Sequence, residues 1–254
     1  MANGRVEARY TLTAAWTGTC TNSVAATPAW SVAAGTYYAT ALAAALQAAL
    51  RAVTSAFATW TVTIASTEGG TGLVTIHKGA AGTWTVTFDQ SDFRDALGFS
   101  ANLTGVTSAQ TGTNAMQGVW LPDSPLVLPT DDDVGILVSD MRQSVSPSGA
   151  VYSLVSNTRR EWTNCTWTHV SKTRVHSTTS SPMSWRQFVS DTQLGGKSYF
   201  PAGARLAIYS NATTNTLLGY YNAVGLVGGQ TEQAIQGWAG RWRVSIPRLV
   251  NQSS

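Results

Sequence analysis

Two segments alternate threonine with large apolar residues, and this alternation constrains the fold more than any other feature. Residues 59–64 read TWTVTI and residues 83–88 read TWTVTF. Successive side chains of a strand point to opposite faces of a sheet, so each segment predicts a strand with one apolar and one threonine face. Residues 73–77 predict a returning strand between them, with glycine-rich turns at 68–72 and 79–82. We expect these three strands to form an antiparallel meander.

Helices are predicted before and after these strands in the sequence. Large apolar residues recur at spacings of three and four from Leu42 to Phe57, which indicates an amphipathic helix of about four turns. Thr36 or Thr40 is expected to cap it, because a hydroxyl accepts hydrogen bonds from the free amides of a first turn. A short helical turn is expected over 92–97, between Ser91 as cap and Gly98 as stop.

A proline-rich stretch suggests how the chain divides. Residues 101–118 are mostly small and polar and are expected to form a loop. Prolines at 122, 125 and 129 disfavour both helix and ladder pairing. We therefore expect a helix-plus-meander domain over 1–120, a connection over 121–130 and a second β-rich domain over 131–254.

The second half predicts several strands and one helix. Residues 184–194 have the helical pattern, and Gly195-Gly196 would end that helix. The fold class we expect is α+β, mainly β: an N-terminal helix packed on a meander, then a sandwich-like domain with one short helix. The strand candidates are 6–12 at the start of the chain and 135–139, 151–155, 161–170, 206–209, 217–221 and 242–246 beyond the connection.

Composition disfavours several classes of function. Charged residues make up only 11% of the chain, against about 25% in typical soluble domains. The net charge is +3, and no dense basic stripe for nucleic acid is present. No segment has the roughly 18 apolar residues of a membrane span, and the N-terminus lacks the apolar core of a signal peptide. Cys20 and Cys165 match no metal spacing, and we favour two free thiols over a disulfide.

Motifs for catalysis or cofactor binding are weak. Residues 195–198 read GGKS, which resembles the end of a phosphate-binding loop. Such a loop follows a strand and precedes a helix, whereas here a helix precedes the segment and extended chain follows it. Asp131-Asp132-Asp133 lacks the spread ligands of a calcium loop and is expected to be a solvated run. The three histidines, His77, His169 and His176, have no familiar metal spacing.

Candidate catalytic groups are equally sparse. Asp140 and Glu161 are carboxylates that no sequence feature brings together. Ser146 to Gly149 lacks the strand-to-helix context of a nucleophile elbow. We therefore predict no enzymatic activity, no cofactor and no metal site.

Two aromatic sets leave two interpretations open. Trp162 with Trp167, and Trp238 with Trp242, could stack on the apolar faces of a sugar. Packing in the core or between subunits is the alternative that we favour, since tryptophan is usually buried.

Two sets of segments resemble those of a known family. One run covers residues 35–122, and a second is formed by 146–149, 185–188 and 194–198. The matching segments of the first run are GTYY at 35–38, an alanine- and leucine-rich helix, WTVT at 60–63, GLVTI at 72–76, FRDALGF at 93–99 and GVWLP at 118–122. These segments resemble structural proteins of tailed bacteriophages. The resemblance implies a virion protein of the tail, tail tip or head–tail region and carries over no catalytic residue.

These observations lead to one functional expectation and one alternative. We expect a non-enzymatic virion component that forms a symmetric homo-oligomer with copies of itself and other virion proteins. The alternative is a capsid decoration protein or a carbohydrate-binding module that recognises a host-surface glycan. The expected contact residues between subunits are Arg159, Arg160, Trp162, Trp238, Arg241 and Arg243, because arginine and tryptophan are enriched at interfaces.

Overall fold

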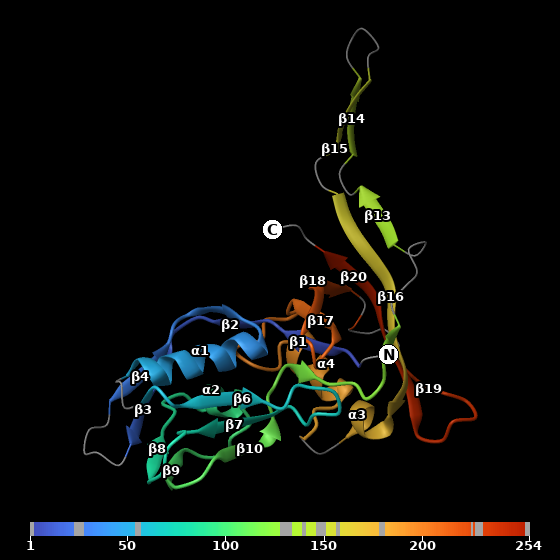
Figure 1. Cartoon of the computed structure of the whole chain (residues 1–254). Coiled ribbons are helices and arrows are strands. Elements are labelled where there is room, and N and C mark those ends of the chain that lie inside the picture. Colours follow the sequence, from blue (N-terminus) through green and yellow to red (C-terminus); the bar gives the residue numbers. More distant parts are fainter. Residues whose placement is uncertain are drawn as a thin grey trace.

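Strands form most of the regular structure, as the α+β, mainly β class requires (Figure 1). The computed structural model describes residues 3–22, 28–53, 57–127, 134–138, 141–145, 151–155, 158–177, 181–224, 226 and 231–251. Within 134–164 the description covers the backbone alone. The acidic run 131–133, Asp140 and residues 146–149 lie outside the described residues.

Within the described chain, the largest sheet has nine strands and brings both ends of the chain together. Its strands are β1 (Arg5–Ala8), β11 (Val119–Trp120), β12 (Leu126–Val127), β13 (Val134–Val138), β16 (Thr158–Ser171), β17 (Leu206–Asn211), β18 (Thr216–Val224), β19 (Glu232–Ala234) and β20 (Arg241–Asn251). The main path is β11-β1-β17-β18-β20-β16-β12, with β13 beside β16 and β19 beside β20. Val6 lies opposite Ile208 of β17, and β20 belongs to the same sheet, so the first and last strands share one sheet. The predicted division at 121–130 stays a prediction, and β1 would belong with the second unit.

The remaining strands form smaller antiparallel sheets. They are β2 (Tyr10–Leu12) with β5 (Gly35–Tyr37); β3 (Trp16–Asn22), β4 (Ala29–Val32), β8 (Trp84–Val86) and β9 (Leu103–Val106); β6 (Thr61–Ile64), β7 (Leu73–His77) and β10 (Gln110–Ala115); and β14 (Met141–Val145) with β15 (Val151–Val155). β6 and β7 pair as predicted. β8, however, pairs with β3 and β9, and β10 takes the place beside β7. The third predicted segment does form a strand, but its predicted place beside β7 is wrong.

The segment 101–118 is not the loop that its composition predicts. It contains β9 and β10, whose exposed positions carry threonine and glycine. Each strand buries few side chains, so the apolar alternation that would identify it is missing. Pairing with the more apolar β8 and β7 supplies the hydrogen-bonding partners that the local sequence does not reveal.

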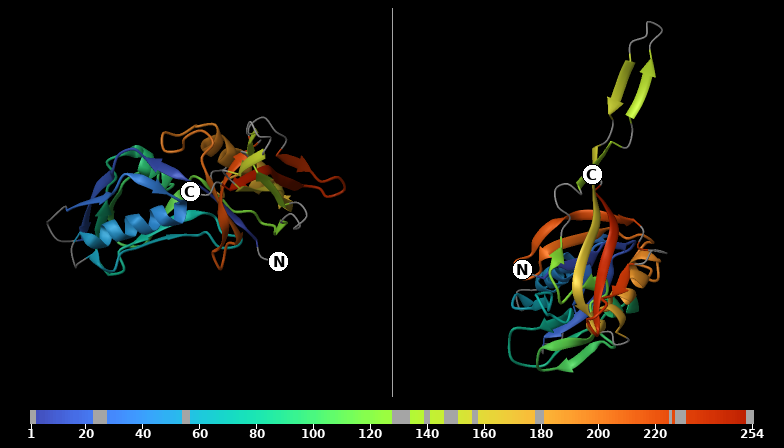
Figure 2. Two further views of the ribbon diagram at one scale, coloured as in Figure 1. Left: turned by 90° about the horizontal axis from the view of Figure 1, so that it is seen from above. Right: turned by 90° about the vertical axis from the view of Figure 1, so that its right-hand side faces the viewer.

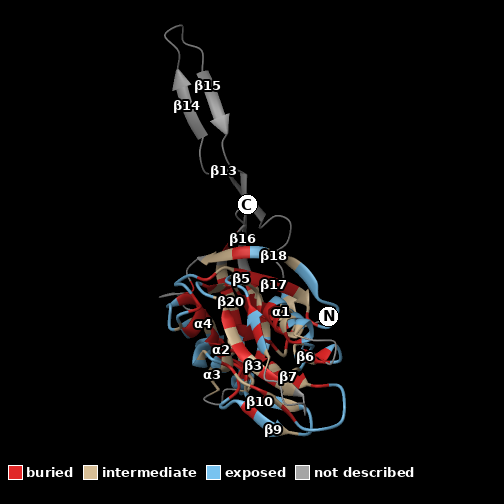
Figure 3. Cartoon of the chain, turned by 90° about the vertical axis from the view of Figure 1, so that its left-hand side faces the viewer, coloured by how far each residue is buried: buried red, intermediate tan, exposed pale blue. Residues whose placement is uncertain are grey.

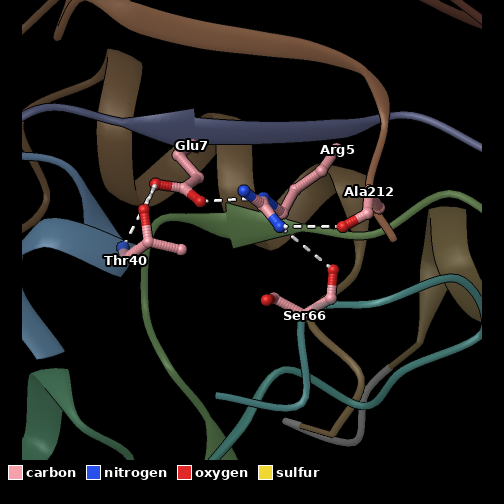
Figure 4. Close-up of polar contacts among 5 residues, drawn as sticks. All are labelled: Arg5, Glu7, Thr40, Ser66 and Ala212. Carbon is pink, nitrogen blue, oxygen red and sulfur yellow. Dashed lines mark hydrogen bonds and ion pairs between the residues drawn. The ribbon is translucent and has the colours of Figure 1, made fainter. Parts of the chain in front are cut away.

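The predicted helix is α1 (Ala39–Ala52), and its buried face carries Leu42, Leu46 and Leu50. It ends before Phe57 and packs against β4 and β6. Neither expected threonine caps it: the N-cap residue is Tyr38, which makes no side-chain cap hydrogen bond. The amide and hydroxyl of Thr40 instead donate to Glu7 Oε2, at 3.2 and 3.1 Å (Figure 4). A carboxylate from β1 thus binds one of the free amides in the first turn of this helix.

Glu7 also belongs to a buried charged pair. Arg5 Nε lies 2.8 Å from Glu7 Oε1, and Arg5 Nη1 donates to the carbonyls of Ser66 and Ala212, both at 3.3 Å (Figure 4). The Arg5 guanidinium lies 4.0 Å from the centre of the Tyr209 ring. These contacts join β1 to α1, to the chain after β6 and to the end of β17.

The other helices are α2 (Ser91–Ala96), α3 (Lys172–His176) and α4 (Trp185–Gln193). α2 ends before Gly98 as predicted, but Gln90 and not Ser91 is its N-cap residue. α4 begins after Ser184, whose hydroxyl accepts from the Gln187 amide at 3.3 Å. α3 was not predicted, because the five residues Lys172 to His176 are too few to show a helical period of apolar residues.

Aromatic side chains fill the interior. Buried residues gather in the body of the molecule, red in Figure 3. Trp120 meets Trp167 edge-on with ring centres 5.0 Å apart and lies 4.6 Å from Trp185. This cluster joins the nine-stranded sheet to α4, and it confirms core packing for Trp167.

Candidate functional site

An exposed tryptophan stands at the turn between β19 and β20. Trp238 is 59% exposed, although most large apolar side chains of the described chain are buried. Its amide donates to the Ile235 carbonyl at 3.2 Å, and its carbonyl accepts from the Arg241 amide at 3.1 Å. Gly237 and Gly240 have φ of 81° and 72°, a region that glycine enters without steric cost. The turn therefore has a defined backbone that presents the indole to solvent.

His169 holds the indole from the neighbouring strand. The His169 and Trp238 rings meet edge to face with their centres 4.7 Å apart. His169 lies where the pairing of β16 with β20 shifts register, between Trp167 and Val170, and its φ is 66°. A left-handed conformation costs a residue with a side chain about 1–3 kcal/mol. The bulge thus turns His169 toward Trp238 at an energetic cost.

Charged groups surround this aromatic pair. Arg241 Nη1 donates to the His169 carbonyl at 3.0 Å and lies 3.9 Å from Asp123 Oδ2. Asp123 Oδ1 accepts from the Ser171 amide at 3.0 Å. The Lys172 amide donates to the Gly240 carbonyl at 3.0 Å, which brings the start of α3 against the turn. Four separate segments therefore converge here.

Two open hollows adjoin Trp238 and Arg241, which line both. One has a volume of about 610 Å³ and is also lined by Lys172, Trp242 and the turn itself. The other, of about 400 Å³, is lined by Asp123, Ser124 and His169 among others. We call Asp123, His169, Lys172, Trp238 and Arg241 the Trp238 site. This site offers an aromatic surface, a carboxylate and cationic hydrogen-bond donors, groups that suit the binding of a ligand.

The predicted contact residues fall into two groups at the two ends of β16. Trp238, Arg241 and Arg243 lie on or beside the β19–β20 turn, and Arg241 and Arg243 are exposed. Arg159, Arg160 and Trp162 occupy the other end of β16, opposite Leu137, Ile136 and Val134 of β13, where the backbone alone is described.

The two tryptophan pairs considered as sugar platforms differ in the structure. Trp167 is fully buried, so the first pair offers no exposed platform through it. Trp242 is partly buried, and the centre of its ring lies 4.1 Å from that of His176. It nevertheless lines the larger hollow together with Trp238. Burial lowers the pKa of His176 below its usual value.

A second feature is the arm formed by β14 and β15. These strands pair with each other in register from Met141 opposite Val155 to Val145 opposite Val151. Figures 1 and 2 show them beyond the body, as a continuation of β13 and β16. Among the described strands, neither pairs with a third. The β15 strand was predicted, whereas β14 was not, because its centre is polar.

Sequence reasoning missed Asp123 and Lys172 as members of the site. Asp123 lies in the segment that we interpreted as a connection, and Lys172 lies in the unpredicted α3. Their proximity to Trp238 depends on long-range pairing, and no local pattern could have indicated it.

In comparisons with known proteins, no family model, curated protein or solved structure matches the chain. Within the described residues, no group of three or more His, Cys, Asp or Glu side chains could hold a metal ion. None of the helices in that part of the chain is long and apolar enough to cross a membrane. Cys20 and Cys165 are both free and buried, as favoured from the sequence.

Proposed function

We propose that this chain is a non-enzymatic structural subunit of a tailed-phage virion, a tail, tail-tip or head–tail protein that assembles as a symmetric homo-oligomer. The resemblance of residues 35–122 to such proteins suggests the class. The β14–β15 arm carries the proposal, because its strands need a partner that the described chain does not supply.

The physical argument concerns the stability of a two-stranded ribbon. An isolated hairpin is marginally stable in water, and three strands or a packed face are needed for independent stability. Both outer edges of such a ribbon leave backbone donors and acceptors free to pair with another chain. In a closed ring each subunit would lay its arm on the next, so every arm would gain a partner without open-ended growth.

The two groups of predicted contacts differ in how they enter this proposal. Arg159, Arg160 and Trp162 lie where β16 leaves the body toward the arm, so a neighbour that covers the arm would also meet them. Trp238, Arg241 and Arg243 stay predicted contacts. The low share of charged residues suits this function, because a surface with few charges gives up little hydration free energy when a neighbouring subunit covers it.

The alternative function, capsid decoration or recognition of a host-surface glycan, has one observation in its favour. The exposed Trp238 lies between two hollows of the size that small ligands occupy. Glycan recognition is compatible with residence in the virion and does not replace the structural function.

The test is to replace residues 141–155 with a short Gly-Ser linker and to compare this variant with the full chain. Light scattering coupled to size-exclusion chromatography measures the mass, and negative-stain microscopy shows the shape. We expect a discrete oligomer for the full chain and a monomer for the variant, with matching circular dichroism spectra and melting temperatures. A monomeric full chain, or an unchanged oligomer without the arm, would contradict the proposal.

A second pair of variants separates the arm from its base. Charge reversal at Arg159 and Arg160 should weaken the oligomer, whereas charge reversal at Arg94, a partly exposed residue on α2, should not. Equal effects of the two substitutions would argue against a contact at the base of the arm.

A further inference from the structure

The Trp238 site has a ligand-binding character that the structural function does not require. We propose that it binds an anionic saccharide, a sugar chain that carries carboxylate groups, with Trp238 as the stacking platform and Arg241 and Lys172 as the carboxylate-binding groups.

The stacking surface comes first in the argument. An aromatic ring has a negative face, which attracts the weakly positive C–H groups on the apolar face of a sugar ring. Trp238 is the most exposed of the large apolar side chains in the described chain, at 59%. Its backbone is fixed by the turn hydrogen bonds, and its ring is held by His169. Such a platform loses little conformational freedom when a ligand binds.

The charges at the site favour a carboxylate over an uncharged hydroxyl. Lys172 and Arg241 are exposed beside the indole, and Arg243 follows on the same strand. The single carboxylate of the site, Asp123, already accepts from the Ser171 amide and lies near Arg241. Arg241 directs Nη1 to the His169 carbonyl, and its other N–H groups, which have no hydrogen-bonding partner in the described part of the chain, can bind an oxygen pair. The local charge is thus net positive.

The shape suits a chain of sugars. The hollows of about 610 and 400 Å³ adjoin the same two residues, so successive sugar rings can occupy both while one ring covers the indole. Ser124 lines the smaller hollow, and its buried hydroxyl has no hydrogen-bonding partner among the described residues. The strained His169 backbone fits the same view, since strain is retained where function requires it.

The test measures binding to the full-length protein by isothermal titration calorimetry. The charged probes are hexagalacturonate, sialyllactose and a heparin hexasaccharide, and the uncharged probes are maltohexaose and cellohexaose. We expect at least one carboxylate-bearing probe to bind, with affinity that falls as salt rises. Trp238→Ala should lower that affinity about tenfold or more, and Arg241→Gln should lower it for the charged probes alone.

Matched controls are available on the same chain. Leu194→Ala removes another large exposed apolar group, at 58% exposure, and Arg94→Gln removes another partly exposed cation. Neither should change binding. The proposal is overturned if no charged probe binds, if uncharged probes bind equally well, or if Trp238→Ala binds as the wild type does.

The oligomeric state separates this inference from the structural function. Trp238→Ala should leave the mass of the oligomer unchanged, because assembly through the arm does not need the Trp238 contact that the sequence predicts. Loss of the oligomer in this variant would show that Trp238 is a subunit contact and would also overturn the ligand proposal. If removal of the arm abolishes the oligomer and Trp238→Ala does not, the saccharide-binding result can be judged separately from the structural function.

Discussion

Arg5 Nε lies 2.8 Å from Glu7 Oε1, and the two side chains are 1% and 0% exposed. Both residues belong to β1 and point to the same side of it, because they are two positions apart. The remaining oxygen of Glu7 accepts from Thr40 at the start of α1, while Arg5 reaches the carbonyls of Ser66 and Ala212. The pair therefore connects elements that are distant in sequence.

Loss of the Glu7 carboxylate should destabilise the fold strongly. Glu7→Ala leaves the buried Arg5 charge without its partner and the Thr40 amide without its acceptor, which costs about 3–5 kcal/mol in free energy of unfolding. Glu7→Gln keeps an oxygen for Thr40 and should cost less. Guanidinium unfolding measures both. The control is Arg94→Ala, which breaks a solvent-accessible ion pair with Asp95 and should cost about 0–1 kcal/mol. An equal loss of unfolding free energy in all three variants would disprove the importance of the buried pair.

The stability that Glu7 contributes should depend on pH with a defined sign. Burial raises the pKa of its carboxyl above 4.5, and Arg5 and Thr40 offset part of that rise. The native state then keeps the proton at a pH at which the unfolded chain has lost it. The contribution to the free energy of unfolding therefore falls as pH rises from 4.5 through the raised pKa.

Because Glu7→Gln cannot titrate, it isolates this effect. We expect the wild type to gain stability relative to Glu7→Gln as the pH is lowered from 7 toward 4.5, as measured by urea unfolding at several pH values. A relative loss of wild-type stability on acidification would show that the folded-state pKa is lowered instead.

Both cysteines should be unreactive in the native protein. Burial raises the pKa of the Cys20 thiol to about 11 and that of Cys165 to about 12, so almost no thiolate is present at pH 8. Ellman's reagent should react slowly with the folded chain. After the chain is unfolded in the absence of reductant, the reagent should react rapidly with two thiols. Rapid reaction before unfolding would contradict their burial, and no reaction afterwards would reveal a disulfide.

His169 should tolerate glycine better than a β-branched residue. Its φ of 66° is freely available to glycine but costs other residues energy, most of all those with a branched Cβ. We expect His169→Val to be less stable than His169→Gly by about 1–3 kcal/mol in thermal or denaturant unfolding. The same two substitutions at His77, on a regular strand, should reverse the order.

A methyl group at Gly18 should disrupt the contact between β3 and its neighbours. An added Cβ would lie 1.9 Å from the Thr87 carbonyl oxygen and 2.5 Å from Trp30 Cζ2. Since backbone and a buried ring must both move, Gly18→Ala should cost about 3 kcal/mol or more. Gly203→Ala meets no atom within 4 Å and bears only the strain of its positive φ, about 1–2 kcal/mol. Equal melting temperatures for the two variants would contradict the close packing at Gly18.

Local patterns identified the elements that bury one regular face. The alternation at 59–64 and 73–77 and the spacing of leucines in α1 were sufficient, because each side chain's direction follows from its position along a strand or helix. The same patterns could not choose strand partners, so β8 was assigned to the wrong neighbour. Polar edge strands such as β9 and β10 were missed, because their stability comes from pairing rather than from burial of their own side chains.

The sequence by itself determined a mainly β chain with sparse charge and one long amphipathic helix. The tertiary structure alone decided that Glu7 meets Thr40, that the first strand pairs with β17, and that Asp123, His169, Lys172 and Arg241 surround Trp238. Periodicity reports which side of an element is apolar, whereas these contacts depend on which elements become neighbours. That choice is made by the packing of the whole core.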